Sequence, residues 1–332
     1  MEFTRYDPRY RWLVERLAGN TLAGEQRLGY PRFGSYPELE KEYGEYPDSS
    51  MDTSAYVILR GGMPVGLVGV LQDADYLAVW GPLTNEEAWY RETIRESLAF
   101  LRGVYAGVLH IFPAKENTVY CQELEEAGGA LRSVQHVMRF TWPACMPEPR
   151  RIGEKYRCFS PEELSQEEAV CREIERLLED GFHLKGQADS LLRELLRDGC
   201  SFLCCLLHGR TAGVLVWNEN FVREIRIEYL AVEKDSRRVG VASNLLGKLL
   251  RMVSVRYGRR SINLTHGGDN LAAHALYVKN GFDDEVVYRE FVLPGQAGEP
   301  QKGTVESKEL PLQATKTCAI IRKDGKDAAR GG

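Results

Sequence analysis

The 332-residue sequence has no apolar run near the roughly 18 residues needed to span a bilayer. Its first residues lead into polar sequence and not into the apolar core of a signal peptide. Basic residues are in deficit, because 43 Lys and Arg stand against 48 Asp and Glu and the net charge is -5. This balance argues against a protein that wraps nucleic acid. We expect a cytoplasmic protein without a membrane or nucleic-acid partner.

Cysteine is also sparse for a chain of this length. The eight cysteines are scattered at positions 121, 145, 158, 171, 200, 204, 205 and 318. They form no C-x-x-C pair, and no histidine stands at a ligand spacing from them. We therefore expect free, mostly buried thiols, with neither a disulfide framework nor a metal site.

The composition is that of a folded protein long enough for two domains. Hydrophobic residues are 43% and charged residues 27% of the chain, and a typical domain has about 150 residues. Three prolines in residues 143–149 predict a linker, and the stretch from Pro294 has no aromatic residue. We expect domains at 1–142 and 154–293, a linker at 143–153 and a disordered tail at 294–332.

The sequence contains an internal repeat. Tyr-Leu-Ala-Val at 76–79 recurs at 229–232, and the same offset of 153 relates Asn117 to Asn270 and Gly128 to Gly281. Upstream, 62–66 resembles 209–213 at an offset of 147, a difference that we assign to a hairpin of different length. Two copies of one fold are therefore predicted.

The second copy has the clearer secondary-structure pattern. Apolar runs, helical spacing and turn residues predict a mixed sheet with helices around it. The predicted strands are 156–159, 201–207, 212–217, 226–232, 261–265 and 286–293, and the predicted helices are 161–178, 189–197, 239–257 and 270–279.

A charged loop follows the predicted strand that ends at Val232 and opens into a helix. Backbone N–H groups at such a helix start point the same way and favour an anion. Arg237 and Arg238 can add charge-assisted hydrogen bonds, and Gly240 and Ala242 keep side chains out of the way. Taken alone, R-x-x-G-x-A is a weak signal and is more typical of an ordinary charged loop before an amphipathic helix.

In its context the loop is more specific. Tyr-Leu-Ala-Val, a charged loop with R-x-x-G-x-A, an amphipathic helix, a strand, and then Asn270-x-x-Ala273 and Tyr277-x-x-x-Gly281-Phe282 together resemble the GNAT superfamily of N-acetyltransferases. The resemblance covers residues 154–293 well and 50–142 weakly. It implies an α/β (α+β) fold of two tandem GNAT-like domains with a degenerate N-terminal copy, each a mixed, mostly antiparallel sheet flanked by helices.

The resemblance also implies acetyl-CoA as acyl donor and a role for particular residues. The strand pairs its backbone with the pantetheine arm, the loop amides hold the pyrophosphate, and the residue at Asn270 contacts the cofactor arm. The residue at Tyr277 protonates the departing thiolate. The cofactor-binding residues predicted in this way are Leu230, Ala231, Val232, Arg237, Arg238, Val239, Gly240, Val241, Ala242, Ser243 and Asn270.

Attack on a thioester requires an uncharged amine, so a base is needed. Glu228 is the first candidate, with a solvated carboxylate or one paired with Arg226 as the alternative; some family members carry the acid at the position of Arg226. His266 is the second candidate, although loop histidines are more often solvated. Tyr277 has its own alternative, a packed ring with its hydroxyl at the surface.

The first copy differs at the positions that matter. With the offset of 153, Thr84, Glu87 and Trp89 of the first copy correspond in this order to Arg237, Gly240 and Ala242 of the second. Leu124 corresponds to Tyr277. A carboxylate and an indole would repel and obstruct a diphosphate. We expect this copy to have lost the donor site and to support the fold or form part of the acceptor cleft.

These observations predict an acyl-CoA-dependent N-acetyltransferase that transfers an acetyl group to a primary amine of a small molecule or peptide. One alternative is a non-catalytic acyl-CoA-binding scaffold or sensor. Another is a tandem-domain aminoacyl-tRNA-dependent transferase. The sequence leaves the acceptor open.

Overall fold

The computed structural model describes residues 1–21, 28–30, 33–74, 76–84, 87–142, 154–219, 224–256, 258 and 260–295. The expected linker at 143–153 and nearly all of the expected tail lie outside these residues. The described chain forms two compact units. Unit 1 comprises residues 1–135 and 286–295, and unit 2 comprises residues 136–285.

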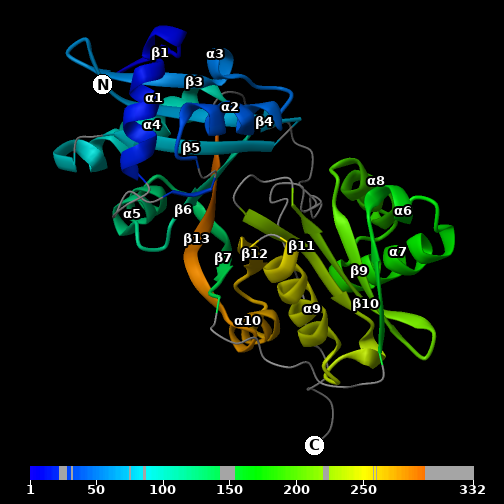
Figure 1. Ribbon diagram of the computed structural model, residues 1–332. Helices are drawn as coiled ribbons and strands as arrows, with labels where there is room; N and C mark the ends of the chain where they lie inside the picture. Colours follow the sequence, from blue (N-terminus) through cyan, green and yellow to red (C-terminus); the bar gives the residue numbers. More distant parts are fainter. Residues whose placement is uncertain are drawn as a thin grey trace, which may run out of the picture. The chain divides into compact units, whose positions relative to one another are not determined.

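Unit 1 is built on a sheet of strand order β1-β3-β4-β5-β6-β13, with β2 beside β6 (Figure 1). Only β5 and β6 pair in parallel; the other pairs described in this unit are antiparallel. The strands are β1 (Glu2–Arg5), β2 (Leu28–Tyr30), β3 (Ala55–Arg60), β4 (Met63–Asp73), β5 (Tyr76–Thr84), β6 (Val108–Pro113) and the second half of β13 (Phe282–Pro294). The helices are η1 (Pro8–Tyr10), α1 (Arg11–Thr21), α2 (Tyr36–Gly44), α3 (Met51–Ser54), η2 (Glu87–Trp89), α4 (Tyr90–Val104) and α5 (Thr118–Glu126).

Unit 2 has the strand order β7-β12-β11-β10-β9-β8. Strands β8 to β11 pair antiparallel, and β11 pairs with β12 in parallel. The strands are β7 (Ala130–Phe140), β8 (Lys155–Phe159), β9 (Ser201–Leu207), β10 (Arg210–Asn218), β11 (Glu224–Val232) and β12 (Ser261–Gly267). The helices are α6 (Pro161–Leu164), α7 (Glu168–Phe182), α8 (Ala188–Arg197), η3 (Lys234–Ser236), α9 (Val241–Arg256) and α10 (Leu271–Lys279).

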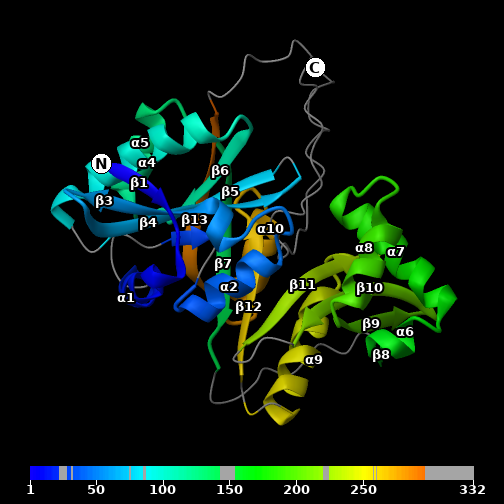
Figure 2. The same ribbon diagram turned by 90° about the horizontal axis from the view of Figure 1, so that it is seen from above.

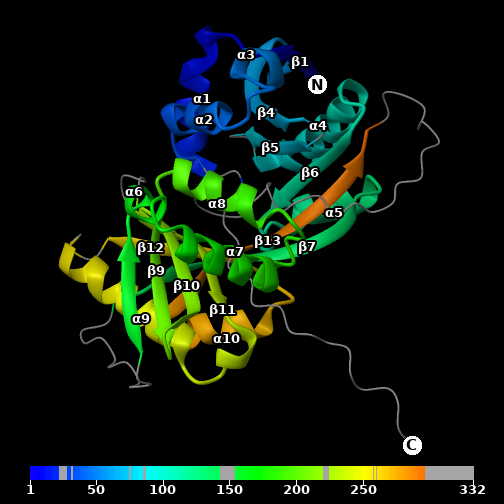
Figure 3. The same cartoon turned by 90° about the vertical axis from the view of Figure 1, so that its right-hand side faces the viewer.

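The helices of unit 2 cover both faces of its sheet, as Figures 2 and 3 show. Apolar side chains of α7 and α8 pack on one face with Phe202 and Val214. Those of α9 and α10 pack on the other face with Leu203 and Leu215. Successive residues of a strand therefore pack into two separate cores, one on each face of the sheet, and this explains why β9 and β10 are apolar throughout. No helix in the described residues is long and apolar enough to cross a membrane.

The predicted fold class is confirmed: each unit is a mixed, mostly antiparallel sheet flanked by helices. Most predicted elements of the second copy lie within a few residues of the observed ones. The single helix expected at 161–178 is instead two helices, α6 and α7. Ser160 and Glu163 form a capping box around a one-turn helix, which ends at Ser165 before α7 begins.

Strands β7 and β13 each contribute to both units. Phe291 of β13 pairs with Ile111 of β6 in unit 1 and is buried in that core. Met138 and Phe140 at the end of β7 are buried in the core of unit 2. The units therefore differ from the contiguous stretches 1–142 and 154–293 that the sequence suggests. The apolar pattern of a strand identifies a buried strand but not the sheet that it joins.

The strand registers correct the alignment of the two copies. Gly213 of β10 pairs with Val232 at the end of β11, and the matching Gly66 of β4 pairs with Thr84 at the end of β5. Val79 lies five residues before Thr84, so it does not occupy the position of Val232. The hairpins are therefore nearly equal in length, and the explanation by a hairpin of different length is wrong. Of the six extra residues of the second copy, one lies in this hairpin and three lie between the third strand and the helix that follows.

Candidate active site

Strands β11 and β12 separate at the centre of unit 2. Their parallel ladder begins at Glu224 and Ser261 and, in the described chain, ends at Ile227 and Leu264. Beyond that pair β11 continues to Val232 and β12 continues to Gly267. The β11 edge facing this opening carries backbone N–H and C=O groups that a ligand with amide groups can pair.

A β-bulge in β11 lies where the opening begins. Val216 of β10 pairs with Tyr229, and Trp217 pairs with Ile227, so Glu228 is the extra residue. A bulge bends its strand and leaves a backbone group outside the regular ladder. The predicted pantetheine strand, from Leu230 to Val232, follows this bend directly.

The loop after β11 has the backbone expected of an anion site. Arg237 donates from Nε to the carbonyl oxygen of Val232 at 3.0 Å and so ties the loop to the strand end. Gly240 has φ 113°, a conformation open to glycine and costly for other residues. Helix α9 then begins at Val241, so the N–H groups of Val241 to Ser243 have no partner within the helix. Diphosphate oxygens are suitable acceptors for them.

A glycine in the neighbouring strand fixes the position of this helix start. A Cβ atom added to Gly213 of β10 would lie 2.8 Å from Cγ1 of Val241. Only a glycine lets the first turn of α9 lie directly against the sheet. The helix N-terminus is therefore held at the mouth of the opening between β11 and β12.

The corresponding helix start in unit 1 is covered. Five residues separate Thr84 from α4, whereas eight separate Val232 from α9. Trp89 precedes α4, and the guanidinium of Arg60 stacks 3.8 Å from its ring centroid. Because Thr84 matches Val232, the assignment of Thr84, Glu87 and Trp89 to Arg237, Gly240 and Ala242 is wrong. The first copy nevertheless has a shorter loop and an indole at its helix start.

Two matched asparagines show the same contrast. Asn117 and Asn270 each cap a helix by accepting from the N–H three residues on, that of Tyr120 or Ala273. The amide nitrogen of Asn117 also donates to the hydroxyl of Tyr90 at 2.7 Å. The amide nitrogen of Asn270 is buried and has no hydrogen-bond partner among the described residues. An unpaired buried donor is costly unless a ligand accepts from it.

The residue three positions after each cap also differs between the copies. In unit 1 the hydroxyl of Tyr120 donates to the backbone oxygen of Gly81 in β5 at 2.6 Å. This side chain fills the place where β5 and β6 separate. The matching residue in unit 2 is Ala273, a methyl group. Unit 2 therefore lacks the side chain that bonds α5 to β5 in unit 1.

Tyr277 lies two turns into α10 and is fully buried. Its ring stacks on His266 with centroids 5.9 Å apart and meets Phe282 at 5.7 Å. The alternative of a packed ring with its hydroxyl at the surface is therefore wrong, since the whole side chain is buried. Leu124 occupies the matching position of α5 and is buried in the core of unit 1.

Glu228 is 5% exposed, so the alternative of a solvated carboxylate is wrong. Burial raises the pKa of the Cys200 thiol, and the nearby charge of Glu228 raises it further. Glu228 therefore lies close to Cys200, which belongs to the core beneath α7 and α8. Arg226 forms an ion pair with Glu224 at 3.4 Å.

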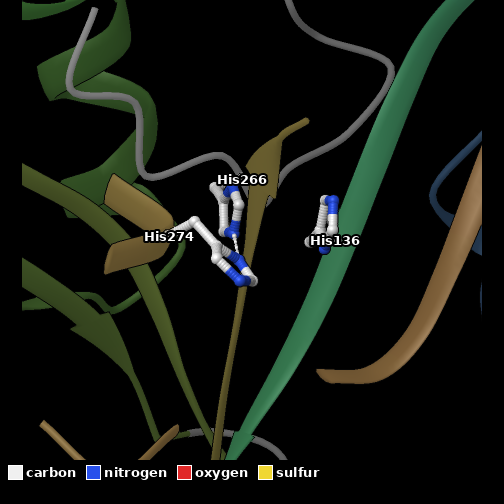
Figure 4. A group of neighbouring side chains, drawn as sticks. All are labelled: His136, His266 and His274. Carbon is white, nitrogen blue, oxygen red and sulfur yellow. Dashed lines mark hydrogen bonds between the residues drawn. The ribbon is translucent and has the colours of Figure 1, made fainter. Parts of the chain in front are cut away.

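Three histidines meet beside Tyr277: His136 from β7, His266 from β12 and His274 from α10 (Figure 4). His266 is fully buried, and the other two are half-buried. Nδ1 of His266 lies 2.8 Å from the carbonyl oxygen of Gly267, and its Nε2 lies 3.2 Å from Nδ1 of His274. Burial lowers the pKa of His266 to about 4, so its ring is neutral near pH 7.

Sequence analysis identified His266 but not its two partners. His274 follows it by eight residues across the turn at Asn270, a spacing without a known signature. His136 is 130 residues away in the sequence, and no pattern links it to the site. Only the packing of β7 against β12 brings it there.

The ring nitrogens of this histidine group lie within 4.8 Å of one another, and it is the one group of metal-ligand side chains found in the described residues. The rings of His136 and His266 are parallel within 5° and their centroids are 4.9 Å apart. A metal ion lies in the plane of each imidazole that binds it. As placed, these two rings cannot share an ion.

Residues 163–282 match the family model of the acetyltransferase (GNAT) family. The matched stretch lies entirely within unit 2. A search of curated proteins gives no match. The GNAT fold extends over nearly the whole chain, as solved structures show: a GCN5-related N-acetyltransferase from Sphaerobacter thermophilus has 18% identity and a TM-score of 0.60, covering 90% of this chain and 96% of its own.

Two further structures show the same fold at low identity. A tandem GNAT protein from the clavulanic acid biosynthesis pathway is 12% identical, with a TM-score of 0.60, and covers 90% of this chain and 99% of its own. An acetyltransferase of the GNAT family from Colwellia psychrerythraea is 11% identical, with a TM-score of 0.55, and covers 88% and 100%. The predicted resemblance to a tandem GNAT arrangement is confirmed.

Proposed function

We propose that the protein is an acyl-CoA-dependent N-acetyltransferase with one donor site, in unit 2, that transfers an acetyl group to a primary amine. One contrast carries this proposal. Unit 2 has Ala273 and the unpaired buried amide of Asn270, whereas in unit 1 the matching Tyr120 bonds to β5 and the matching Asn117 bonds to Tyr90.

The residues present fit acetyl-CoA as the donor. Its pantetheine arm has amide groups that the β11 edge from Leu230 to Val232 can pair. Its diphosphate suits the amides from Arg238 to Ser243, at the positive end of α9. A carbonyl group of the arm would satisfy the buried amide nitrogen of Asn270.

Acetyl-CoA supplies the thioester, and the chain supplies what the transfer needs. An N–H of β11 near the bulge can donate to the oxygen on which negative charge develops. Tyr277 can give its hydroxyl proton to the departing sulfur. The amine must lose a proton before it attacks, because a lysine-like amine has a pKa of about 10.4.

The two alternatives make different demands on these residues. A non-catalytic scaffold needs the loop but not Tyr277, which is present and packed beside His266. A transferase that takes its acyl group from aminoacyl-tRNA needs a basic surface and no diphosphate site. The net charge of -5 and the open helix start at Val241 favour acetyl-CoA over tRNA.

Calorimetry of acetyl-CoA with the full chain, followed by a mass-spectrometric screen of amines, tests the proposal. We expect one equivalent bound per chain and an acetylated amine in the screen. Two equivalents would contradict the single donor site. Binding without transfer to any amine would favour the scaffold, and displacement of CoA by aminoacyl-tRNA would favour the third function.

A further inference from the structure

We propose that Nε2 of His274 is the base that accepts the proton of the acceptor amine, and that His266 is a positioning residue that orients it. This inference rests on the proposed function, because it names the base of that same transfer. It also differs from the sequence prediction, in which Glu228 and His266 were the candidates.

The hydrogen bonds fix which ring nitrogens carry protons. The carbonyl oxygen of Gly267 can only accept, so Nδ1 of His266 is the donor of their 2.8 Å contact. In neutral His266 the Nε2 atom is then the acceptor. The 3.2 Å contact to His274 therefore uses the Nδ1–H of His274 as donor. This leaves the lone pair of His274 on Nε2, the nitrogen remote from His266.

The same chain of bonds makes His266 a poor base and His274 a better one. His266 is fully buried and its Nε2 is already an acceptor. Burial lowers its pKa to about 4, with the neighbouring His136 and His274 adding to the effect and Asp284 opposing it. The Nε2 lone pair of His274, in contrast, is not used by this chain of hydrogen bonds and can take a proton.

Two observations place the hydrogen-bonded pair of His266 and His274 near the proposed site of acyl transfer. His266 lies two residues beyond Leu264, where β12 has already left β11. On α10, Asn270, His274 and Tyr277 stand at positions i, i+4 and i+7, which share one helix face. Asn270 and Tyr277 are buried, whereas His274 is half-buried and lies between them. It is the member of this face that an incoming amine can reach.

The other groups that face the two rings come from β7 and β13. His136 stacks on His266 and meets His274 edge-on with centroids 5.0 Å apart. Its Nδ1 lies 3.0 Å from a carboxylate oxygen of Asp284. His136 opposes a second proton on His266, whereas Asp284 favours it.

The protons balance in the complete reaction. His274 removes one proton from the ammonium group, and the amine nitrogen then bonds to the thioester carbon. The carbon–sulfur bond breaks, and Tyr277 gives its proton to the sulfur. Tyr277 regains a proton from the nitrogen that has become an amide, and His274 releases its proton to water.

The first arm of the test is nuclear magnetic resonance of the full chain. Long-range ¹H–¹⁵N spectra distinguish the two tautomers of each of the six histidines, with assignments from single His→Gln variants. From pH 5.5 to 9 we expect His266 to stay neutral with its proton on Nδ1. We expect neutral His274 to carry its proton on Nδ1. A proton on Nε2 of neutral His274 would overturn the proposal.

The second arm is the steady-state kinetics of acetyl transfer with an amine from the screen. His274→Gln should lower kcat by about a hundredfold or more and leave acetyl-CoA affinity unchanged. His266→Gln keeps an acceptor near the position of Nε2 and should retain activity within a few fold. His266→Phe keeps a ring but no acceptor, so it should lower kcat and leave acetyl-CoA affinity unchanged.

The control is His208→Gln, in the exposed turn between β9 and β10, which should change neither readout. A kcat of His274→Gln equal to that of the wild type would overturn the proposal. Binding of one equivalent of Co²⁺ by the wild type, lost when any of the three clustered histidines is replaced, would also overturn it. If the wild-type chain acetylates no amine, both proposals fall. If His266 and His274 nevertheless show the expected tautomers, the proposed acetyl transfer is wrong and the hydrogen-bonded pair is correctly described.

Discussion

Replacing Gly240 separates two properties of the loop before α9, its backbone conformation and its preference for an anion. Gly240 has φ 113°, outside the left-handed region that Asn or Asp tolerates. Any side chain there should cost about 1–3 kcal/mol of backbone strain. Gly240→Gln and Gly240→Glu have nearly the same shape, so they share this strain, and only Gly240→Glu adds a charge.

The size of the electrostatic difference follows from Coulomb's law. A carboxylate about 4 Å from one diphosphate charge, at an effective dielectric constant of about 20, is repelled by about 4 kcal/mol. A side chain at the surface can turn away, so we expect about half of this value. The Kd for acetyl-CoA should then be at least about thirtyfold higher in Gly240→Glu than in Gly240→Gln, since 1.4 kcal/mol is a factor of about ten.

Calorimetry at low and high salt provides the measurement, with circular dichroism to show that both variants are folded. The gap between the two variants should narrow at about 1 M salt, where the screening length falls to about 3 Å. Equal affinities for Gly240→Glu and Gly240→Gln in folded protein would refute the reasoning, because the loop would then not meet an anion.

Three further predictions concern single residues, and the first two compare matched positions of the two copies. Tyr277→Phe should lower kcat by about a hundredfold with acetyl-CoA affinity unchanged, as steady-state kinetics would show. Leu124→Ala at the matching position should create a cavity that costs about 2–5 kcal/mol of stability, measured by urea unfolding, and should leave acetyl-CoA binding unchanged. Asn270→Ala and Asn117→Ala should each lose a helix cap worth about 0.5–2 kcal/mol, but only Asn270→Ala should weaken acetyl-CoA binding in calorimetry. In the folded chain the pKa of His266 is about 4, below its ordinary value of 6.5. Between these pH values the unfolded chain therefore binds more protons than the folded chain. The contribution of His266 to the free energy of unfolding should fall by up to about 3 kcal/mol as the pH drops from 6.5 to 4. Unfolding free energies of wild type and His266→Gln across that range should therefore converge at low pH, and a constant difference would contradict this.

The amino-acid sequence determined the local structure of this protein. Apolar alternation set the strands from β9 to β12, and Asn270 and Gly281 set the ends of α10, because these signals act over a few residues. The loop around Gly240 could also be predicted, because the residues that form it follow one another in the sequence. The family resemblance followed from these local signals in their order.

Only the tertiary structure decided which distant segments share a sheet and a site. The second half of β13 joins unit 1, and the end of β7 joins unit 2, although apolar pattern alone suits either sheet. The repeated Tyr-Leu-Ala-Val segments are out of register, because strand pairing follows Gly66 and Gly213 and not the matching letters. His136 reaches His266 only through the packing of β7 on β12. Pairing and packing depend on partners far along the chain, and no local pattern records them.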